Sequence, residues 1–210
     1  MAQSVLSEPV LEQQPAAPGT IAVRKARLQD ARNIYDLVNS LSHDGTLLRR
    51  NYAELCENIR DFTVAERTSD DPTVDAEFLG CGALHLYGPH LAEVRSIVVR
   101  PEAKGLGAGG KLLHALINEA AQHEVLSVCL FTRIPSFFDR FGFRVAERGD
   151  MPDKIYKDCQ TCPRLYACDE VAMVRGPLPK IAVLGPSTIQ RPELAQPLVQ
   201  VQLKPTGTAR

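Results

Sequence analysis

Hydrophobic positions along the chain follow two different periods, and together they predict short strands and amphipathic helices. Across residues 28–41, apolar side chains recur every three or four positions, which is typical of one face of a helix. Strands are predicted where short apolar runs are bounded by turn residues. The predicted helices are 28–41, 51–59, 112–123 and 136–141, and the predicted strands are 21–26, 62–67, 77–87, 91–99, 126–131, 143–147 and 170–175.

The order of these elements indicates a single α/β domain with one mixed sheet. Residues 62–67 and 77–87 are joined by an acidic turn, which predicts a hairpin, and a strand-helix-strand unit follows later in the chain. This arrangement predicts helices on both faces of the sheet. We expect the domain to span residues 20–176, with a flexible leader at 1–19 and a Pro-rich C-terminal tail at 177–210.

Composition and charge narrow the classes of function. A formal net charge of -1, without a basic block, gives little support for nucleic-acid binding. No apolar run approaches the roughly 20 residues that cross a bilayer, and the N-terminus lacks the basic start and apolar block of a secretory signal. We therefore expect a cytoplasmic protein that does not bind membranes, in which the six cysteines are reduced thiols or metal ligands.

The most distinctive stretch is VRPEAKGLGAGGKLL, residues 99–113, in which four glycines separate a predicted strand from an amphipathic helix. Glycine lets the backbone turn tightly and approach a ligand, and a helix N-terminus favours an anion because its first N–H groups are unpaired. A flexible turn is the simpler interpretation. The stretch is not a nucleotide-binding P-loop, because Leu112 follows Lys111 where Ser or Thr would stand.

This stretch and its surroundings resemble the GNAT superfamily of acyl-CoA acetyltransferases. The family's loop pattern, [Q/R]-x-x-G-x-[G/A], is matched by Lys104, Gly107 and Gly109, with Lys in place of Gln or Arg. PSFFDRFGFR, residues 135–144, is similar to the family's closing motif FYxxxGF. Within the superfamily, residues 151–174 look most like the acetyltransferase domain of short bacterial N-acetylglutamate synthases.

The resemblance implies an enzyme that transfers the acetyl group of acetyl-CoA to the α-amine of L-glutamate by direct attack in a ternary complex. That reaction is the first step of arginine biosynthesis. GNAT proteins often dimerise, so a homodimer is also implied. Two alternatives stay open: another amino-acid or protein amine as the acceptor, and a non-catalytic acyl-CoA or metal sensor.

In this fold acetyl-CoA is expected between the fourth and fifth strands, with no requirement for a metal. The glycine loop would hold the pyrophosphate and the fourth strand the pantetheine arm. A backbone N–H at Val98 or Val99 would polarise the thioester carbonyl. The residues expected to bind the cofactor are Ile97, Val98, Val99, Lys104, Gly105, Leu106, Gly107, Ala108, Gly109 and Gly110.

The acceptor ammonium must lose a proton before it attacks, and Glu93 lies on the fourth strand where the family often places its general base. The plain alternative is a solvent-facing glutamate paired with Arg95. Phe138 occupies the position of the family's usual tyrosine acid. Tyr156, Ser136 or water are the substitutes considered, and the sequence does not choose among them.

A glutamate acceptor carries two carboxylates, which guanidinium groups match best. We expect Arg49 or Arg50, together with Lys154, to bind them, and Arg95 is a further candidate. Each of these cations alone is more often a solvated surface charge.

Three cysteines, Cys159, Cys162 and Cys168, form the pattern C-x2-C-x5-C. Two close cysteines are half of a zinc site, but a structural zinc site needs four ligands. Plain thiols in a loop that covers the substrate are therefore preferred to a metal site.

Overall fold

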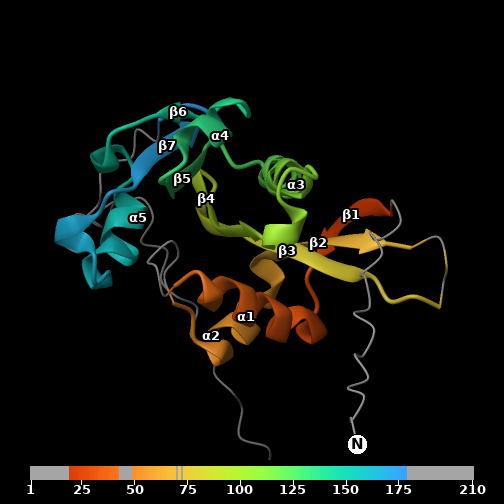
Figure 1. The fold of residues 1–210 in the computed structure, drawn as a ribbon. Coiled ribbons are helices and arrows are strands. Elements are labelled where there is room, and N and C mark those ends of the chain that lie inside the picture. The colour runs from red at the N-terminus through yellow and green to blue at the C-terminus, as the bar shows by residue number, and fades with distance from the viewer. Residues whose placement is uncertain (1–18, 43–48, 70, 72, 179–210) are drawn as a thin grey trace, which may run out of the picture. The chain divides into compact units, whose positions relative to one another are not determined.

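A seven-stranded sheet organises the residues that the computed structural model describes, which are 19–42, 49–69, 71 and 73–178 (Figure 1). Its strands are β1 (Thr20–Lys25), β2 (Phe62–Thr68), β3 (Glu77–Gly88), β4 (Leu91–Val99), β5 (Val128–Thr132), β6 (Arg144–Val145) and β7 (Val171–Arg175). The spatial order is β1-β2-β3-β4-β5-β7-β6. β4 and β5 are parallel and the other neighbouring pairs are antiparallel, which confirms the predicted mixed sheet.

Helices cover both faces of this sheet, as predicted. α1 (Ala31–Ser40) and α2 (Tyr52–Glu57) lie on one face, and α3 (Ala108–Gln122) lies on the other (Figure 1). Within the described residues, no helix combines the length and the apolar character that a membrane span needs. The predicted leader and tail lie outside the described residues, apart from residues 19, 177 and 178.

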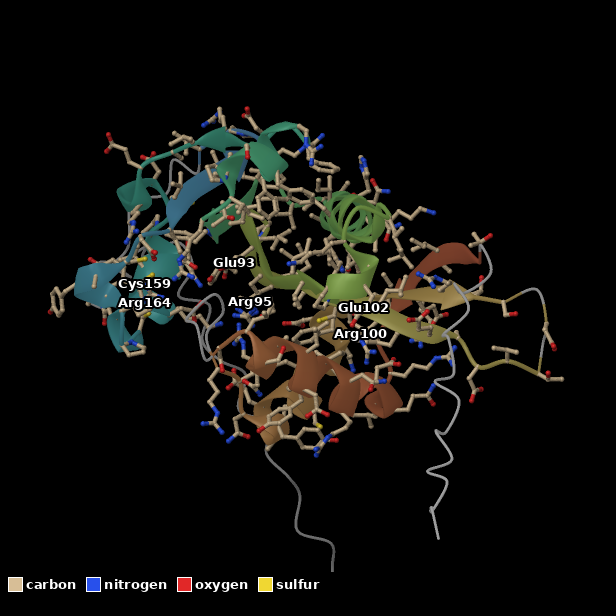
Figure 2. The ribbon with its side chains drawn as sticks, viewed as in Figure 1. Glu93, Arg95, Arg100, Glu102, Cys159 and Arg164 are labelled. Atoms are coloured by element: carbon tan, nitrogen blue, oxygen red, sulfur yellow. The ribbon has the colours of Figure 1, made fainter. Side chains whose placement is uncertain are left out.

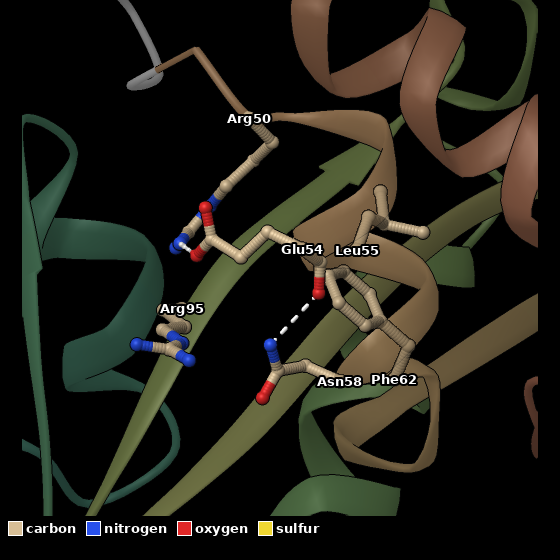
Figure 3. Close-up of a pocket in the computed structure, with 6 residues that line it drawn as sticks. All are labelled: Arg50, Glu54, Leu55, Asn58, Phe62 and Arg95. Atoms are coloured by element: carbon tan, nitrogen blue, oxygen red, sulfur yellow. Dashed lines mark hydrogen bonds and ion pairs between the residues drawn. The ribbon is translucent and has the colours of Figure 1, made fainter.

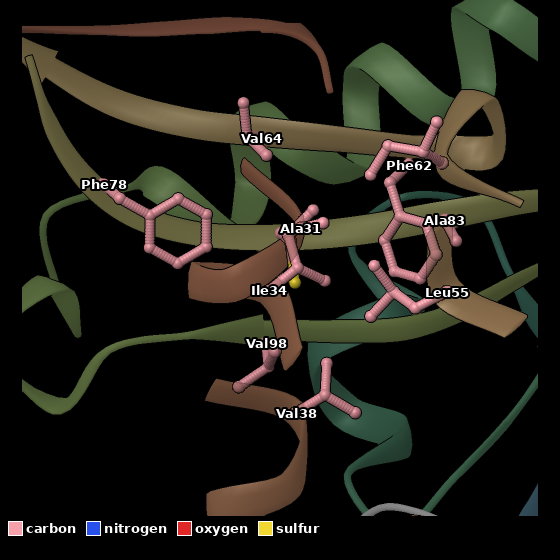
Figure 4. Packing of buried hydrophobic residues seen from close by; sticks show 11 residues of the cluster. Ala31, Ile34, Val38, Leu55, Phe62, Val64, Phe78, Ala83 and Val98 are labelled. Atoms are coloured by element: carbon pink, nitrogen blue, oxygen red, sulfur yellow. The ribbon is translucent and has the colours of Figure 1, made fainter. Parts of the chain in front are cut away.

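Each face of the sheet has its own apolar core. The first core joins α1 and α2 to β2, β3 and β4 (Figure 4), and the second joins α3 to β4, β5 and β7. The residues of the first core include Ala31, Ile34, Val38, Leu55, Phe62, Val64, Phe78, Ala83 and Val98. The residues of the second include Leu113, Leu116, Val128, Leu130, Phe138 and Met173. These two cores pack against opposite faces of β4, the strand that carries the candidate site.

The structure differs locally from the predicted elements. The helix predicted from residue 28 begins with a 3₁₀ turn, Leu28–Asp30, before α1 starts. α3 begins at Ala108, four residues before the predicted start, because Gly109 and Gly110 belong to its first turn. Besides the predicted short helix, here α4 (Pro135–Asp139), the described residues contain an unpredicted one, α5 (Pro152–Lys157).

The fourth and fifth strands pair over a very short distance. Their register joins Ala92 to Val128 and Glu93 to Cys129. Further along, β4 contains a bulge, because Ser96 and Ile97 together stand opposite Gly82 of β3, and Ser96 has a φ of 52°. A bulge bends its strand and increases the local twist, so β4 turns away just after its pairing with β5 ends. Residues 97–99 therefore lie beyond the point where β4 and β5 are paired.

Candidate active site

Glu93 is a buried carboxylate at the point where β4 and β5 pair (Figure 2). Only 2% of its surface is exposed. Its Oε1 lies 2.8 Å from Nζ of Lys154, and its Oε2 accepts a hydrogen bond of 2.8 Å from the hydroxyl of Tyr87. A buried charge is tolerated only when it is paired and hydrogen-bonded, and these two contacts supply that. The alternative of a solvent-facing glutamate paired with Arg95 is wrong.

Lys154, on α5, reaches Glu93 directly, and Asp158, the residue after α5, contacts Lys154. They lie one helical turn apart, and Nζ of Lys154 is 3.1 Å from Oδ2 of Asp158. The Tyr87 hydroxyl is also 3.1 Å from that same oxygen. Glu93, Lys154, Asp158 and Tyr87 therefore form a closed ring of polar contacts, which we call the Glu93 ring.

The protonation states of the Glu93 ring follow from its charges. Burial alone would lower the pKa of Lys154, but the carboxylates of Glu93 and Asp158 raise it above its ordinary value. Burial opposes ionisation of Asp158, yet Lys154, Tyr87 and Arg95 together lower the pKa of its carboxyl. Burial and the two carboxylates raise the pKa of Tyr87. The lysine is thus an ammonium and the tyrosine a neutral hydroxyl at neutral pH.

A small pocket lies beside this ring, between α2 and β4 (Figure 3). It is lined by Arg50, Glu54, Leu55, Asn58, Phe62 and Arg95. Two of the predicted substrate-binding arginines, Arg50 and Arg95, therefore meet in one place. Lys154 is instead held by Glu93 and Asp158, and Arg49 is exposed and does not line the pocket.

The two arginines of the pocket make only long contacts with carboxylates among the described residues. Arg50 is 3.4 Å from Glu54, whose side chain is 53% exposed, and its other amino group is 3.4 Å from Oγ of Ser96. Arg95 is 3.7 Å from Asp158 and 3.8 Å from Asp61. These distances exceed the roughly 2.7–2.9 Å of a strong charge-assisted hydrogen bond. The pocket consequently retains capacity to bind an anion.

The glycine loop places unpaired backbone N–H groups at the start of α3. Gly105 and Gly107 have φ values of 81° and 87°, in the left-handed region that favours glycine. At this end of the helix the N–H of Lys111 donates to the carbonyl of Gly107 at 3.0 Å. The N–H groups of residues 108–110 therefore have no acceptor within the helix. Lys104 and Leu106 are exposed in the same turn.

The end of β4 lies close to this loop. A Cβ atom built on Gly109 would lie 3.9 Å from Cγ1 of Val99 and 3.6 Å from Phe137. Val98 is 7% exposed in the first core, while Ile97 and Val99 are half-buried and pack against the side of the sheet that α3 covers. The predicted cofactor residues are thus brought together, and their binding of a cofactor stays a prediction.

The residues considered for the acid step differ in their exposure. Tyr156 is 58% exposed and lies on α5 away from the side that Lys154 and Asp158 present to Glu93. Ser136 is also exposed. Phe138 is 3% exposed in the second core, so its role is packing.

Sequence reasoning missed Tyr87 and Asp158. The signal for Tyr87 lay in the hairpin of β3 and β4, whose register sets His85 opposite Glu93 and so brings Tyr87 to the same end of the sheet. The signal for Asp158 was the Lys-x-x-x-Asp spacing with Lys154, which is a favourable pair on a helix.

Cys159, Cys162 and Cys168 are free, partly exposed thiols in the segment after α5 (Figure 2 labels Cys159). Among the described residues, no group of three or more His, Cys, Asp or Glu side chains is arranged to hold a metal ion. Burial raises the pKa of Cys159, so its thiolate is disfavoured.

Comparison with known proteins defines the class of this fold and site. Residues 58–145 match the family model of the acetyltransferase (GNAT) domain. An uncharacterized N-acetyltransferase, CT2212 of Chlorobaculum tepidum, is 35% identical over 153 residues, which are 73% of this chain and 94% of that protein. The chain therefore belongs to the GNAT family of acetyltransferases, which confirms the resemblance seen in its motifs and the prediction of an acyl-transferring enzyme.

Two comparisons with Mycobacterium tuberculosis are more specific. An amino-acid acetyltransferase is 31% identical over 136 residues, which are 65% of this chain and 75% of that protein. The crystal structure of Rv2747 in complex with CoA and NLQ superposes with a TM-score of 0.62 at 26% identity, covering 75% of this chain and 99% of that one.

Proposed function

We propose that this protein is an N-acetylglutamate synthase, which transfers the acetyl group of acetyl-CoA to the α-amine of L-glutamate as the first step of arginine biosynthesis. The observation that carries the proposal is the pocket in which Arg50 and Arg95 meet beside the Glu93 ring. A glutamate acceptor brings two carboxylates, and two guanidinium groups are the side chains best suited to hold them. The similarity to an amino-acid acetyltransferase supports an amino-acid acceptor.

Acetyl-CoA is the proposed acyl donor, as the similarity to a protein crystallised with CoA supports. The unpaired N–H groups of residues 108–110 would receive the pyrophosphate, with Lys104 adding positive charge at the entrance of the loop. The pantetheine arm would follow residues 97–99, where β4 has turned away from β5. A backbone N–H at Val98 or Val99 would stabilise the oxyanion that forms on the thioester carbonyl.

The proposed reaction uses the carboxylate of Glu93 as general base and a backbone N–H of β4 to stabilise the oxyanion. Glu93 removes a proton from the substrate ammonium, and the resulting amine attacks the thioester carbon. The tetrahedral intermediate collapses with loss of the CoA thiolate, which takes the second nitrogen proton and leaves as the thiol. Nζ of Lys154 lies 2.8 Å from Oε1 of Glu93, so we assign Lys154 to positioning the general base rather than to binding a substrate carboxylate.

The test is release of CoA thiol from acetyl-CoA with a panel of acceptors: glutamate, glutamine, aspartate, other amino acids and a peptide with a free N-terminus. We expect glutamate to give the highest kcat/KM. Higher activity with another amine would identify a different acceptor, and CoA binding without any turnover would identify a sensor. Arginine biosynthesis, a cytoplasmic location and a homodimer stay predictions.

Variants of the pocket sharpen this test. Arg50→Gln and Arg95→Gln should each remove a charge-assisted contact with a substrate carboxylate, which contributes about 1.5–3 kcal/mol. The KM for glutamate should therefore rise roughly 10- to 150-fold. The KM for acetyl-CoA should stay unchanged. Arg49→Gln is the matched control, because Arg49 is exposed next to Arg50 and does not line the pocket.

A further inference from the structure

The proposed reaction leaves one proton to be disposed of in every cycle. The acceptor nitrogen enters as an ammonium and leaves as an amide, so it loses two protons, of which the CoA thiolate keeps one. The other is taken by Glu93. Because Glu93 is only 2% exposed, it cannot hand that proton directly to bulk water.

Tyr87 connects Glu93 to the surface. Its hydroxyl lies 2.8 Å from Oε2 of Glu93 and 3.1 Å from Oδ2 of Asp158. Both distances are those of ordinary hydrogen bonds, and a hydroxyl can donate to one oxygen while it accepts a proton from the other. The side chain of Asp158 is 26% exposed, compared with 3% for that of Glu93. The bridge therefore runs from a buried carboxylate to one that water reaches.

We propose that Tyr87 relays the proton of each catalytic cycle from Glu93 to Asp158, a role that rests on the proposed function. Protonated Glu93 gives its proton to the Tyr87 oxygen while the Tyr87 hydroxyl gives its own proton to Oδ2 of Asp158. One O–H bond breaks and one forms at each step, and the tyrosine remains neutral throughout. Asp158 then releases the proton to water, and rotation of the hydroxyl restores the starting state.

The other groups around Tyr87 do not offer an equivalent route. Lys154 also touches both carboxylates, but it is an ammonium, which carries no free lone pair to accept a proton. The His85 ring packs edge-on against Tyr87 with centroids 5.0 Å apart, and its nitrogens face Arg95 at 3.1 Å and Lys157 at 2.8 Å. Lys157 lies over the Tyr87 ring, 5.7 Å from its centroid. Among these described groups, the Tyr87 hydroxyl is the one that can pass a proton between the two carboxylates and stay neutral.

Substitution Tyr87→Phe tests the relay, because it keeps the aromatic ring and removes the bridging oxygen. We expect kcat to fall by about tenfold or more, the scale of a lost proton-transfer group, while KM for both substrates changes little. A small diffusible base such as imidazole should restore kcat of the variant in a saturable manner at constant ionic strength. The same base should not accelerate the wild-type enzyme.

Two further variants separate the relay from a structural role. Asp158→Asn removes the proton acceptor and should show the same buffer-dependent recovery. Tyr35→Phe, in the half-buried Tyr35 of α1, is the matched control and should leave kcat unchanged. Unchanged kcat in Tyr87→Phe, or a loss that imidazole does not recover, would overturn the relay.

The test of the proton relay does not depend on which amine is the acceptor, so it can be separated from the test of the proposed function. Every ammonium acceptor releases the same proton, so the variants are assayed with whichever amine the wild-type enzyme acetylates best. Poor activity with glutamate but turnover of another amine would refute only the proposed acceptor. A wild-type protein that acetylates no amine would overturn both proposals.

Discussion

Replacing Lys154 by methionine removes the only full positive charge within hydrogen-bond distance of Glu93 in the described part of the chain. The methionine keeps most of the apolar stem of the lysine, so the change tests charge more than volume. Glu93 would be left as a buried carboxylate, with the Asp158 carboxylate joined to it through Tyr87.

The size of the effect follows from burial. Removing one partner of a buried ion pair costs about 3–5 kcal/mol of unfolding free energy, because the remaining charge is stranded. For a protein of this size, each kcal/mol of unfolding free energy lowers the melting temperature by about 2–4 °C. The melting temperature of the variant should therefore fall by roughly 6–20 °C. The Lys25–Glu119 pair is the matched control, since its 2.7 Å contact is as short but the Lys25 side chain is 47% exposed. Lys25→Met should cost less than about 1 kcal/mol.

Urea denaturation followed by circular dichroism measures both variants, with a change in midpoint at constant m-value as the expected signature. The double variant Glu93→Gln with Lys154→Met should recover most of the loss, because neither charge is then stranded. If Lys154→Met costs no more than Lys25→Met, the buried pair does not exist in solution. The reasoning about the Glu93 ring would then be refuted.

Two further predictions concern the glycine loop and the ion pair between Asp30 and Arg24. Gly109→Ala should leave the melting temperature unchanged, because the new methyl makes ordinary contacts at 3.6 Å and 3.9 Å. It should raise the KM for acetyl-CoA severalfold. An unchanged KM counts against the loop as the pyrophosphate site. Burial opposes ionisation of Asp30, yet the hydrogen bonds from Arg24 lower the pKa of its carboxyl in the folded protein. The ionised Asp30 therefore stabilises the fold above about pH 4, and this stabilisation is lost as the pH falls through the pKa of Asp30 in the folded protein. Asp30→Asn should therefore flatten the acid side of a plot of melting temperature against pH; an unaltered slope contradicts this.

Local periodicity was sufficient to predict the sheet and the main helices. Each main helix buries one apolar stripe, and the central strands are runs of largely buried residues, so each pattern is a property of a short stretch and can be read without knowing the partner. The glycine loop was equally local, because Gly105 and Gly107 take the left-handed conformations that glycine favours.

The helix α5 could not be predicted in the same way. It has six residues and no buried residue, so it has no apolar stripe. Its position depends on contacts with the sheet, above all those of Lys154 with Glu93, which are far apart in the sequence. In the alternative to a general base, the sequence offered Arg95 as the partner of Glu93, because alternate residues of a strand share a face. It gave no sign that a cation from a distant helix would take that place.

The arrangement of charges around the site is consistent with the acceptor that we propose. Glu93 and Asp158 supply two negative charges at one end, and Lys154 neutralises part of them without leaving the ring. Arg50 and Arg95 supply two positive charges in the neighbouring pocket. A glutamate acceptor offers one ammonium to the carboxylates and two carboxylates to the two guanidinium groups, whereas a simple amine offers the guanidinium groups no anion. We therefore expect activity to depend on the number of carboxylates on the acceptor more than on its length.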